Sequence, residues 1–332
     1  MELQRNTVLD KIRNCTPEAC AFIDKWYDDT DYIVAHTSGS TGSPKPIKLL
    51  KTDMRISARS TNSFFNITDV SRLLCPLSAN YIAGKMMIVR AIMSGAELWM
   101  EPPSNAPVCT DYGDIDMIAV VPSQVPHLLG DQRIVKRVRN ILIGGAQLSA
   151  KISEQIVKAG VSAYVSYGMT ETCSHVALRK VDGCTPEQYE AMPDIDFGTD
   201  DRGCLVVRSD ARSFKEIYTN DMVELIDHRH FIWKGRIDNV INSGGIKVYP
   251  EEIEKELQQI MPDGIKYYIS KTIDEKWGEA PVLVISECVD DCTKLLADVR
   301  GCVKMKVQRP IDIIVRPIEY TSTGKIIRQK IV

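Results

Sequence analysis

The stretch from residue 36 to residue 48 reads HTSGSTGSPKPIK, and it decides how the rest of the chain is interpreted. It combines Ser and Thr hydroxyls with two glycines, two prolines and two lysines, and it follows a strand-like run at residues 32–35. Glycines let backbone amides approach an anion closely, hydroxyls donate hydrogen bonds, and lysine adds positive charge. The pattern predicts a phosphate-binding loop after a strand. A solvent loop rich in Ser and Gly is the alternative, and the Walker order of residues is absent.

Composition narrows the class of protein. The chain has 332 residues, 44% of them hydrophobic and 26% charged, with a net charge of −3. These values predict a soluble protein with two domains, and they do not favour nucleic acid or an anionic membrane as partner. The N-terminal segment has no apolar run, and no window approaches the roughly 18 apolar residues of a membrane span. Ten scattered cysteines without a Cys-x-x-Cys pair indicate reduced thiols in a cytoplasmic protein.

Strand-like and helical segments alternate in the first two thirds of the chain. Residues 117–121 and 140–143 are apolar strand candidates, and the second runs into Gly144-Gly145. Residues 149–160 have helical spacing and end in a glycine, and residues 162–167 are again strand-like. This alternation predicts an α/β fold with a mostly parallel sheet.

The pattern changes after about residue 195. Residues 202–208 and 213–225 alternate like antiparallel strands and predict a small β subdomain. Beyond residue 236 a smaller α+β segment follows, in which Pro250 and two glutamates suit the first turn of a helix. We therefore expect two domains, residues 1–237 and 238–332, with the boundary at Asp238.

Four further stretches, together with the opening loop, resemble the signature motifs of the adenylate-forming superfamily of acyl-CoA synthetases, adenylation domains and luciferases. They are YGMTET at 167–172, YTND at 218–221, the run from GRID at 235 to IE at 254, and TGKIIR at 323–328. Each match alone would be weak. Five matches in the family order, from residue 36 to residue 328, identify the chain as a member.

The resemblance implies a reaction in two halves, with ATP, Mg²⁺ and coenzyme A as its small molecules. A carboxylate attacks the α-phosphate of ATP to give an acyl adenylate and pyrophosphate, and a thiol then displaces AMP. Such chemistry depends on positioning and on neutralised charge. The resemblance also implies a large N-terminal domain and a small mobile α+β domain after it.

By the same resemblance, each motif has a role in nucleotide binding. The phosphate loop comprises Thr37, Ser38, Gly39, Ser40, Thr41, Gly42 and Lys45; adenine lies between Tyr167-Gly168 and Gly144-Gly145-Ala146; Thr170 bonds the α-phosphate and Glu171 carries Mg²⁺. Asp221 accepts the ribose hydroxyls, although Asn220 stands where the family has glycine, and Arg236 reaches the sugar or a phosphate. The alternatives are a solvated Lys45, a helix-capping Glu171 and an ordinary buried aromatic at Tyr167.

The C-terminal motifs imply a catalytic lysine and a hinge. Lys325 would stabilise charge at the α-phosphate during adenylation. The small domain would then rotate about Asp238, and Gly244-Gly245 would approach and admit the thiol, because a narrow channel leaves no room for side chains. A lysine in a disordered tail is the alternative for Lys325.

The choice of acid rests on a narrower resemblance. Residues 121–125, 141–148 and 167–174, and the SGG run with VYP after it, are most similar to the o-succinylbenzoate–CoA ligases of menaquinone biosynthesis. In the segment 75–90, Gly84 and Arg90 keep the family spacing, and Tyr81 stands at the position of an aromatic or histidine gate, although the segment is two residues longer here. Arg90 would pair with the non-reacting carboxylate of the substrate. A surface helix arginine is the alternative.

Other functions stay open at this point. A fatty-acyl or aryl-CoA ligase, or an enzyme that loads a carrier protein, would share every motif and differ in the acid pocket. A binding protein that lost the chemistry is disfavoured by intact Lys45, Glu171 and Lys325. Only 35 residues precede His36, so most of the first N-terminal subdomain of the family is expected to be missing. A homodimer partner could cover the wall that this leaves open.

Overall fold

The computed structural model describes residues 2–36, 45–107, 112–320, 326–329 and 331. Its helices are α1 (Glu2–Leu9), α2 (Pro17–Trp26), α3 (Lys51–Phe65), α4 (Ile82–Ser94), α5 (Val125–Gly130), α6 (Gln132–Arg137), α7 (Ala150–Ala159), α8 (Pro250–Leu257) and α9 (Cys292–Cys302), with 3-10 turns η1 (Pro122–Gln124), η2 (Thr170–Thr172), η3 (Ile237–Asn239) and η4 (Lys306–Gln308). No helix in these ranges is long and apolar enough to cross a membrane.

Three sheets organise the described strands. The large sheet has the order β1 (Ile12–Arg13), β5 (Glu97–Met100), β4 (Arg72–Cys75), β6 (Met117–Val120), β7 (Asn140–Ile143), β8 (Ser162–Gly168), β9 (His175–Lys180), β10 (Tyr189–Ala191), β14 (His230–Arg236), β13 (Glu216–Leu225), β12 (Cys204–Arg208) and β11 (Asp196–Thr199). A hairpin pairs β2 (Tyr32–His36) with β3 (Pro46–Leu50). The third sheet contains β15 (Ile241–Ser243), β16 (Ile246–Val248), β17 (Tyr267–Asp274), β18 (Gly278–Ile285) and β19 (Ile313–Val315).

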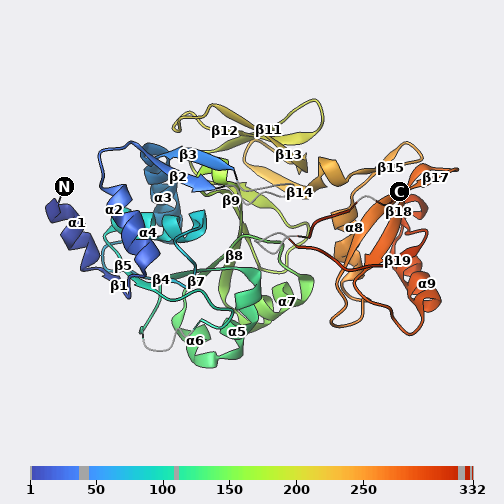
Figure 1. The fold of residues 1–332 in the computed structure, drawn as a ribbon, viewed down its shortest axis with the longest axis horizontal. Coiled ribbons are helices and arrows are strands. Elements are labelled where there is room, and N and C mark those ends of the chain that lie inside the picture. Colours follow the sequence, from blue (N-terminus) through green and yellow to red (C-terminus); the bar gives the residue numbers. More distant parts are fainter. Residues whose placement is uncertain (1, 37–44, 108–111, 321–325, 330, 332) are drawn as a thin grey trace.

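The strands from β1 to β8 in the large sheet run parallel. Alternate side chains of one strand enter different cores: Leu73 packs with residues of α2, α3 and α4, whereas Leu74 packs with residues of α5, α6 and α7. Figure 1 shows the same division, with α2–α4 on one side of these strands and α5–α7 on the other. Strands buried on both faces read as continuous apolar runs, which is why they were recognisable in the sequence.

The sheet reverses direction at β8. This strand pairs in parallel with β7 on one side and antiparallel with β9 on the other, and antiparallel strands continue to β11. The predicted antiparallel strands therefore extend the large sheet itself. The carboxyl ends of the parallel strands β7 and β8 lie at the same edge of the sheet, the edge at which open α/β sheets bind ligands.

Local signals explain the helix that joins β7 to β8. Ser149 accepts a hydrogen bond from the amide of Ile152 at the N-terminus of α7, and Gly160 ends the helix with a φ of +68°. Serine at the N-cap and glycine in the left-handed region are the favoured residues for these two positions. The predicted helix is confirmed to within one residue at each end.

The chain leaves the large sheet after β14 and forms the third sheet, on the right of Figure 1. The turn η3, which contains Asp238, separates β14 from β15. The third sheet has its own core, to which α8 and α9 contribute Ile253, Leu257, Leu295 and Val299. The division into two domains at residue 238 remains a prediction. A separate sheet with its own core after residue 238 supports it.

Candidate nucleotide and acid site

Two segments of the predicted nucleotide site leave the same edge of the large sheet. Residues 144–146 follow β7, and the turn η2 follows β8, its parallel neighbour. Gly145 has a φ of +89°, and a Cβ on Gly144 would lie 2.7 Å from the hydroxyl of Ser166. The backbone conformation favours glycine at position 145, and a side chain at position 144 would displace the Ser166 hydroxyl. Gly145 and Ala146 are exposed, which leaves this surface open to a planar base.

The turn with Thr170 and Glu171 is fastened by its own residues. The hydroxyl of Thr172 accepts from the amide of Met169 at 3.1 Å and lies 2.7 Å from the carbonyl of Ser174. Cys173 adopts a φ of +64°, which is uncommon for a residue with a side chain. Glu171 is exposed, and no described residue forms a hydrogen bond or ion pair with its carboxylate. A carboxylate in this state fits a hard cation shared with phosphate oxygens.

No cluster of three or more metal-ligating side chains occurs in the described ranges. Mg²⁺ commonly takes one or two protein carboxylates together with phosphate oxygens and water. Glu171 is the carboxylate that the family motif predicts for this role.

Asp221 lies at the centre of a polar cluster beside the nucleotide surface. Its carboxylate accepts from the Tyr167 hydroxyl at 2.7 Å and from the Trp233 indole at 3.2 Å, and Arg236 lies 3.6 Å away. Burial, and after it the charge of Asp221, raises the pKa of Tyr167 well above its usual value. Each carboxylate oxygen has two lone pairs, so further hydrogen bonds from a ribose remain available. Trp233 is a residue of this cluster that the motifs did not reveal.

The three residues predicted to contact the acid differ in exposure. Tyr81, at the N-terminus of α4, is 56% exposed. Gly84 is buried, and a Cβ there would lie 2.3 Å from the Ser78 carbonyl, so its absence allows α4 to pack against that loop. Arg90 is 2% exposed, which contradicts the alternative of a surface arginine.

Arg90 belongs to a chain of hydrogen bonds inside the protein. Its Nη2 donates to Ser174 at 2.8 Å, Ser174 lies 3.4 Å from Nδ1 of His175, and Nε2 of His175 lies 3.1 Å from the Thr61 hydroxyl. Because Thr61 donates to the Ser57 carbonyl, it accepts from His175, and the imidazole carries its proton on Nε2. Burial, and after it the charges of Arg90 and Arg212, lowers the pKa of His175 well below 6.5.

The C-terminal predictions are placed only in part. Asp238 is exposed in η3, and its carboxylate lies 3.2 Å from Arg236. Gly244 and Gly245 have φ values of +59° and +80°, and a Cβ on Gly244 would lie 2.6 Å from the Trp277 ring.

Lys45 is exposed directly before β3. Thr37, Ser38, Gly39, Ser40, Thr41, Gly42 and Lys325 lie outside the described residues.

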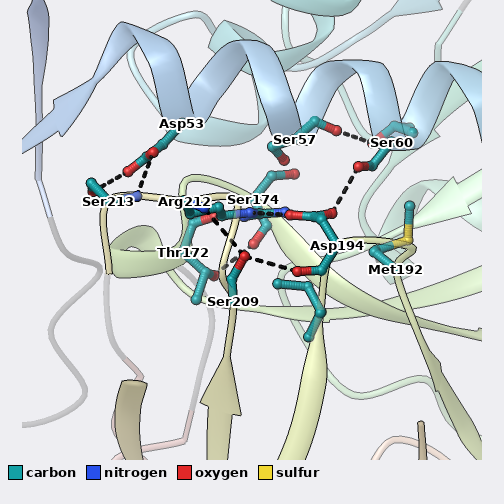
Figure 2. Close-up of polar contacts among 12 residues, drawn as sticks. Asp53, Ser57, Ser60, Thr172, Ser174, Met192, Asp194, Ser209, Arg212 and Ser213 are labelled. Atoms are coloured by element: carbon teal, nitrogen blue, oxygen red, sulfur yellow. Dashed lines mark hydrogen bonds and ion pairs between the residues drawn. The ribbon is translucent and has the colours of Figure 1, made fainter. Parts of the chain in front are cut away.

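A buried polar network beneath the turn was not predicted. It joins α3 to the segments around Thr172, Asp194 and Arg212, as Figure 2 shows. The Arg212 side chain is fully buried and its Nε lies 2.6 Å from Asp194. These partners are 18 residues apart, and no motif marks either of them.

Comparison with known proteins gives the class. Residues 14–196, more than half of the chain, match the model of the AMP-binding enzyme family, and the chain belongs to this family. An acyl-CoA synthetase (AMP-forming)/AMP-acid ligase II-like protein from Dyadobacter fermentans is 34% identical, with 95% of this chain and 92% of that one covered and a TM-score of 0.63. The predicted superfamily and α/β fold are confirmed.

Two further relatives carry a more specific name. The 2-succinylbenzoate–CoA ligase of Listeria monocytogenes is 27% identical over 344 residues, which cover 95% of this chain and 72% of that one. The o-succinylbenzoate coenzyme A synthetase of Bacillus subtilis, solved with ATP and a magnesium ion, has a TM-score of 0.78 at 21% identity, with 89% of this chain and 68% of that one covered. The second comparison establishes a common fold.

Proposed function

We propose that this chain is an ATP-dependent acid–CoA ligase and that its acid is o-succinylbenzoate. The class follows from the family, and curated relatives that carry this name support the acid. The single observation in the structure that supports it is Arg90. This guanidinium is buried, its Nε has no hydrogen-bond partner, and no carboxylate pairs with it within the described part of the chain.

A buried cation without an anion is costly, by several kcal/mol in proteins. Burial lowers the pKa of Arg90 to about 10, so the group is still charged at neutral pH. A substrate carboxylate would supply the missing charge and would match the planar guanidinium in geometry. An acid with two carboxylates can do this and still present the second carboxylate to ATP. A fatty acid or a simple aryl acid cannot, and Arg90 therefore favours the dicarboxylate over these alternatives.

In the first half-reaction the chain binds ATP between the residues that follow β7 and those that follow β8. Gly144, Gly145 and Ala146 would face one side of the base and Tyr167 the other, while Asp221 would accept hydrogen bonds from the ribose. Thr170 and the 37–45 loop would hold the phosphates. When bound through Glu171, Mg²⁺ supplies neutralisation of phosphate charge. Lys325 would stabilise the charge that develops at the α-phosphate.

In the second half-reaction the third sheet would turn about Asp238, which removes Lys325 from the site. Gly244 and Gly245 would then line the path of the CoA thiol. Their positive φ values and the close approach of Trp277 to Gly244 explain why side chains are absent there. A homodimer that completes the open wall of the site, and a cytoplasmic location where ATP and CoA are present, belong to the same proposal.

Pyrophosphate release tests the proposal. We would supply ATP and Mg²⁺ with o-succinylbenzoate, benzoate or a medium-chain fatty acid, each with and without CoA. Of the three acids, we expect only o-succinylbenzoate to release pyrophosphate. When CoA is present, we expect its CoA thioester to form. Release with a different acid would refute the substrate and keep the class. Thioester formation on a carrier protein but not on free CoA would favour the loading enzyme.

A further inference from the structure

Arg212 lies in the connection between β12 and β13, far in sequence from every motif. Its side chain has no exposed surface. Nε approaches a carboxylate oxygen of Asp194 at 2.6 Å, and Nη1 donates to the carbonyl of Thr172 at 2.8 Å. Its guanidinium thus joins a carboxylate to the backbone of the turn that carries Thr170 and Glu171 (Figure 2).

The Asp194 partner keeps this guanidinium in place. Burial alone would raise the pKa of Asp194, but the hydrogen bond and charge of Arg212 hold that pKa below its usual value. Asp194 also accepts from the hydroxyl of Ser60 at 2.7 Å, and Ser209 donates to its carbonyl at 2.8 Å. A planar guanidinium with one edge fixed in this way directs its remaining N–H groups in defined directions. One of them is directed at Thr172.

The turn is supported from outside as well as by its own residues. Cys173, directly after the Thr172 carbonyl, has a φ of +64°, and such a conformation persists only where surrounding contacts hold it. Arg212 supplies a charge-assisted hydrogen bond at that carbonyl. Glu171 is one residue before Thr172, so a shift of this carbonyl would move the carboxylate that we assign to the metal.

The residue after Arg212 connects the same loop to α3. The amide of Ser213 donates to Asp53 at 2.9 Å, and its hydroxyl donates to the other oxygen of Asp53, which is 5% exposed. Asp53 lies in the first turn of α3, which directly follows β3 and the phosphate loop before it. The strand β3 also contacts η2. Arg212 and Ser213 therefore bind, side by side, the turn η2 and the first turn of α3.

We propose that Arg212 is a positioning residue, which sets the place of the Glu171 carboxylate relative to β3 and the first turn of α3. Arg212 touches no substrate in this account, and it acts through Thr172 and through its ion pair with Asp194. The inference rests on the proposed function, because it requires Glu171 to hold Mg²⁺. It predicts a specific defect in the use of Mg²⁺ with ATP, whichever acid the enzyme takes.

Two variants test this role. Arg212→Lys keeps a positive charge beside Asp194 and loses the hydrogen bond to the Thr172 carbonyl. The double variant Asp194→Asn/Arg212→Met removes both charges together, and replacing a buried ion pair by neutral groups is often neutral for stability. The matched control is Arg208→Met, since Arg208 on β12 makes an exposed ion pair with Glu216 at 2.8 Å. We would measure melting by circular dichroism and ATP binding by calorimetry across a range of Mg²⁺ concentrations.

We expect folded variants that need roughly 10-fold or more Mg²⁺ for half-maximal ATP binding, the size typical of lost support behind a metal ligand. Thioester formation from preformed acyl adenylate should stay at the rate of the wild type, and Arg208→Met should match it throughout. An unchanged Mg²⁺ requirement would overturn the inference. Failure of both variants to fold would show that the pair is purely structural, and would overturn it as well.

The calorimetric measurement separates this inference from the proposed function. If no acid leads to pyrophosphate release, the proposed function fails, while the Mg²⁺ dependence of ATP binding still decides the role of Arg212. A wild-type chain that binds ATP without any effect of Mg²⁺ would contradict the positioning role.

Discussion

The turn after β8 and the third sheet are held in different ways. The turn rests on buried polar contacts: Arg212 binds the Thr172 carbonyl and Asp194, and both oxygens of Asp53 are bound by Ser213. The segment after α8 meets α7 through an exposed ion pair, Lys151 with Asp263 at 3.2 Å, in which both side chains are largely in solvent. Val240, directly before β15 of the third sheet, packs with Cys204 and Met222 in a small buried cluster.

The turn is held by buried charged contacts, whereas the ion pair between α7 and the segment after α8 is open to solvent. Exposed ion pairs contribute little, about 0 to 1 kcal/mol, and can be exchanged for others. A buried ion pair is costly to break, about 3 to 5 kcal/mol when one partner is lost. The contacts around η2 are therefore costlier to break than such exposed ion pairs, and we propose that the third sheet adopts a second orientation during the reaction. A reaction with two successive steps in one site can use such a change of orientation.

The largest effect should come from Lys325, in the part of the chain that we propose to rotate. Lys325→Ala should slow adenylation roughly 100- to 1,000-fold, the usual loss when one charge-stabilising group is removed. The same variant should form thioester from preformed acyl adenylate almost normally. Rapid-quench kinetics of the two half-reactions measure this. An equal loss in both would remove Lys325 from its assigned role.

Arg90→Ala should give the next largest effect. The Michaelis constant for o-succinylbenzoate should rise roughly 10- to 100-fold, which corresponds to one charged hydrogen-bonded pair. The constant for ATP should change little. The matched control is Lys85→Ala on the same helix, since Lys85 donates to the carbonyls of Ala79 and Asn80 and lies over the Phe22 ring. Equal shifts for acid and ATP would mean that Arg90 is structural.

Asp238→Pro tests whether the third sheet rotates about this residue. Proline fits a first helical turn such as η3, so the orientation seen here should persist, but its fixed φ opposes the second orientation. Thioester formation should slow on the order of tenfold while adenylation is spared, because domain movement limits only the later step. Stopped-flow measurement of AMP release from preformed adenylate gives the rate. An unimpaired thiol step would rule out a hinge at this residue.

The smallest effect concerns stability at mildly acidic pH. The pKa of His175 is lowered in the folded chain by burial and by Arg90 and Arg212. The unfolded chain therefore binds the extra proton first, and stability is present above the usual pKa of 6.5 and declines as pH falls below it. The loss grows as pH falls further below 6.5, because the unfolded chain takes up a proton that the buried imidazole resists. His175→Gln should remove this part of the pH dependence of the melting temperature; an unchanged slope would contradict the assignment.

Much of the fold was predictable because its signals are local. The strands β2, β7 and β8 and the capped helix α7 are marked by apolar runs, glycines and a serine within a few residues of each other. The joining of parallel and antiparallel strands into one sheet was not predictable. The pairing of β8 with β9 depends on how side chains pack on both faces of the sheet. At the site, motifs indicated Tyr167, Glu171 and Asp221.

The residues that support them could not be found in this way. Ser213 lies 160 residues from Asp53, and Arg212 lies 40 residues from Thr172. Nothing in the sequence near Arg212 distinguishes it from Arg208, which is exposed. Only the fold decides which of the two arginines is buried beneath the turn.

The most direct test of the account is to identify the product. We would incubate the purified chain with ATP, Mg²⁺, CoA and o-succinylbenzoate and analyse the mixture by mass spectrometry, beside two analogues that each lack one of the two carboxylates. The account predicts an o-succinylbenzoyl-CoA thioester and AMP, with little product from either analogue. Equal turnover of an analogue that lacks the non-reacting carboxylate would contradict the pairing of that carboxylate with Arg90, and with it the proposed acid.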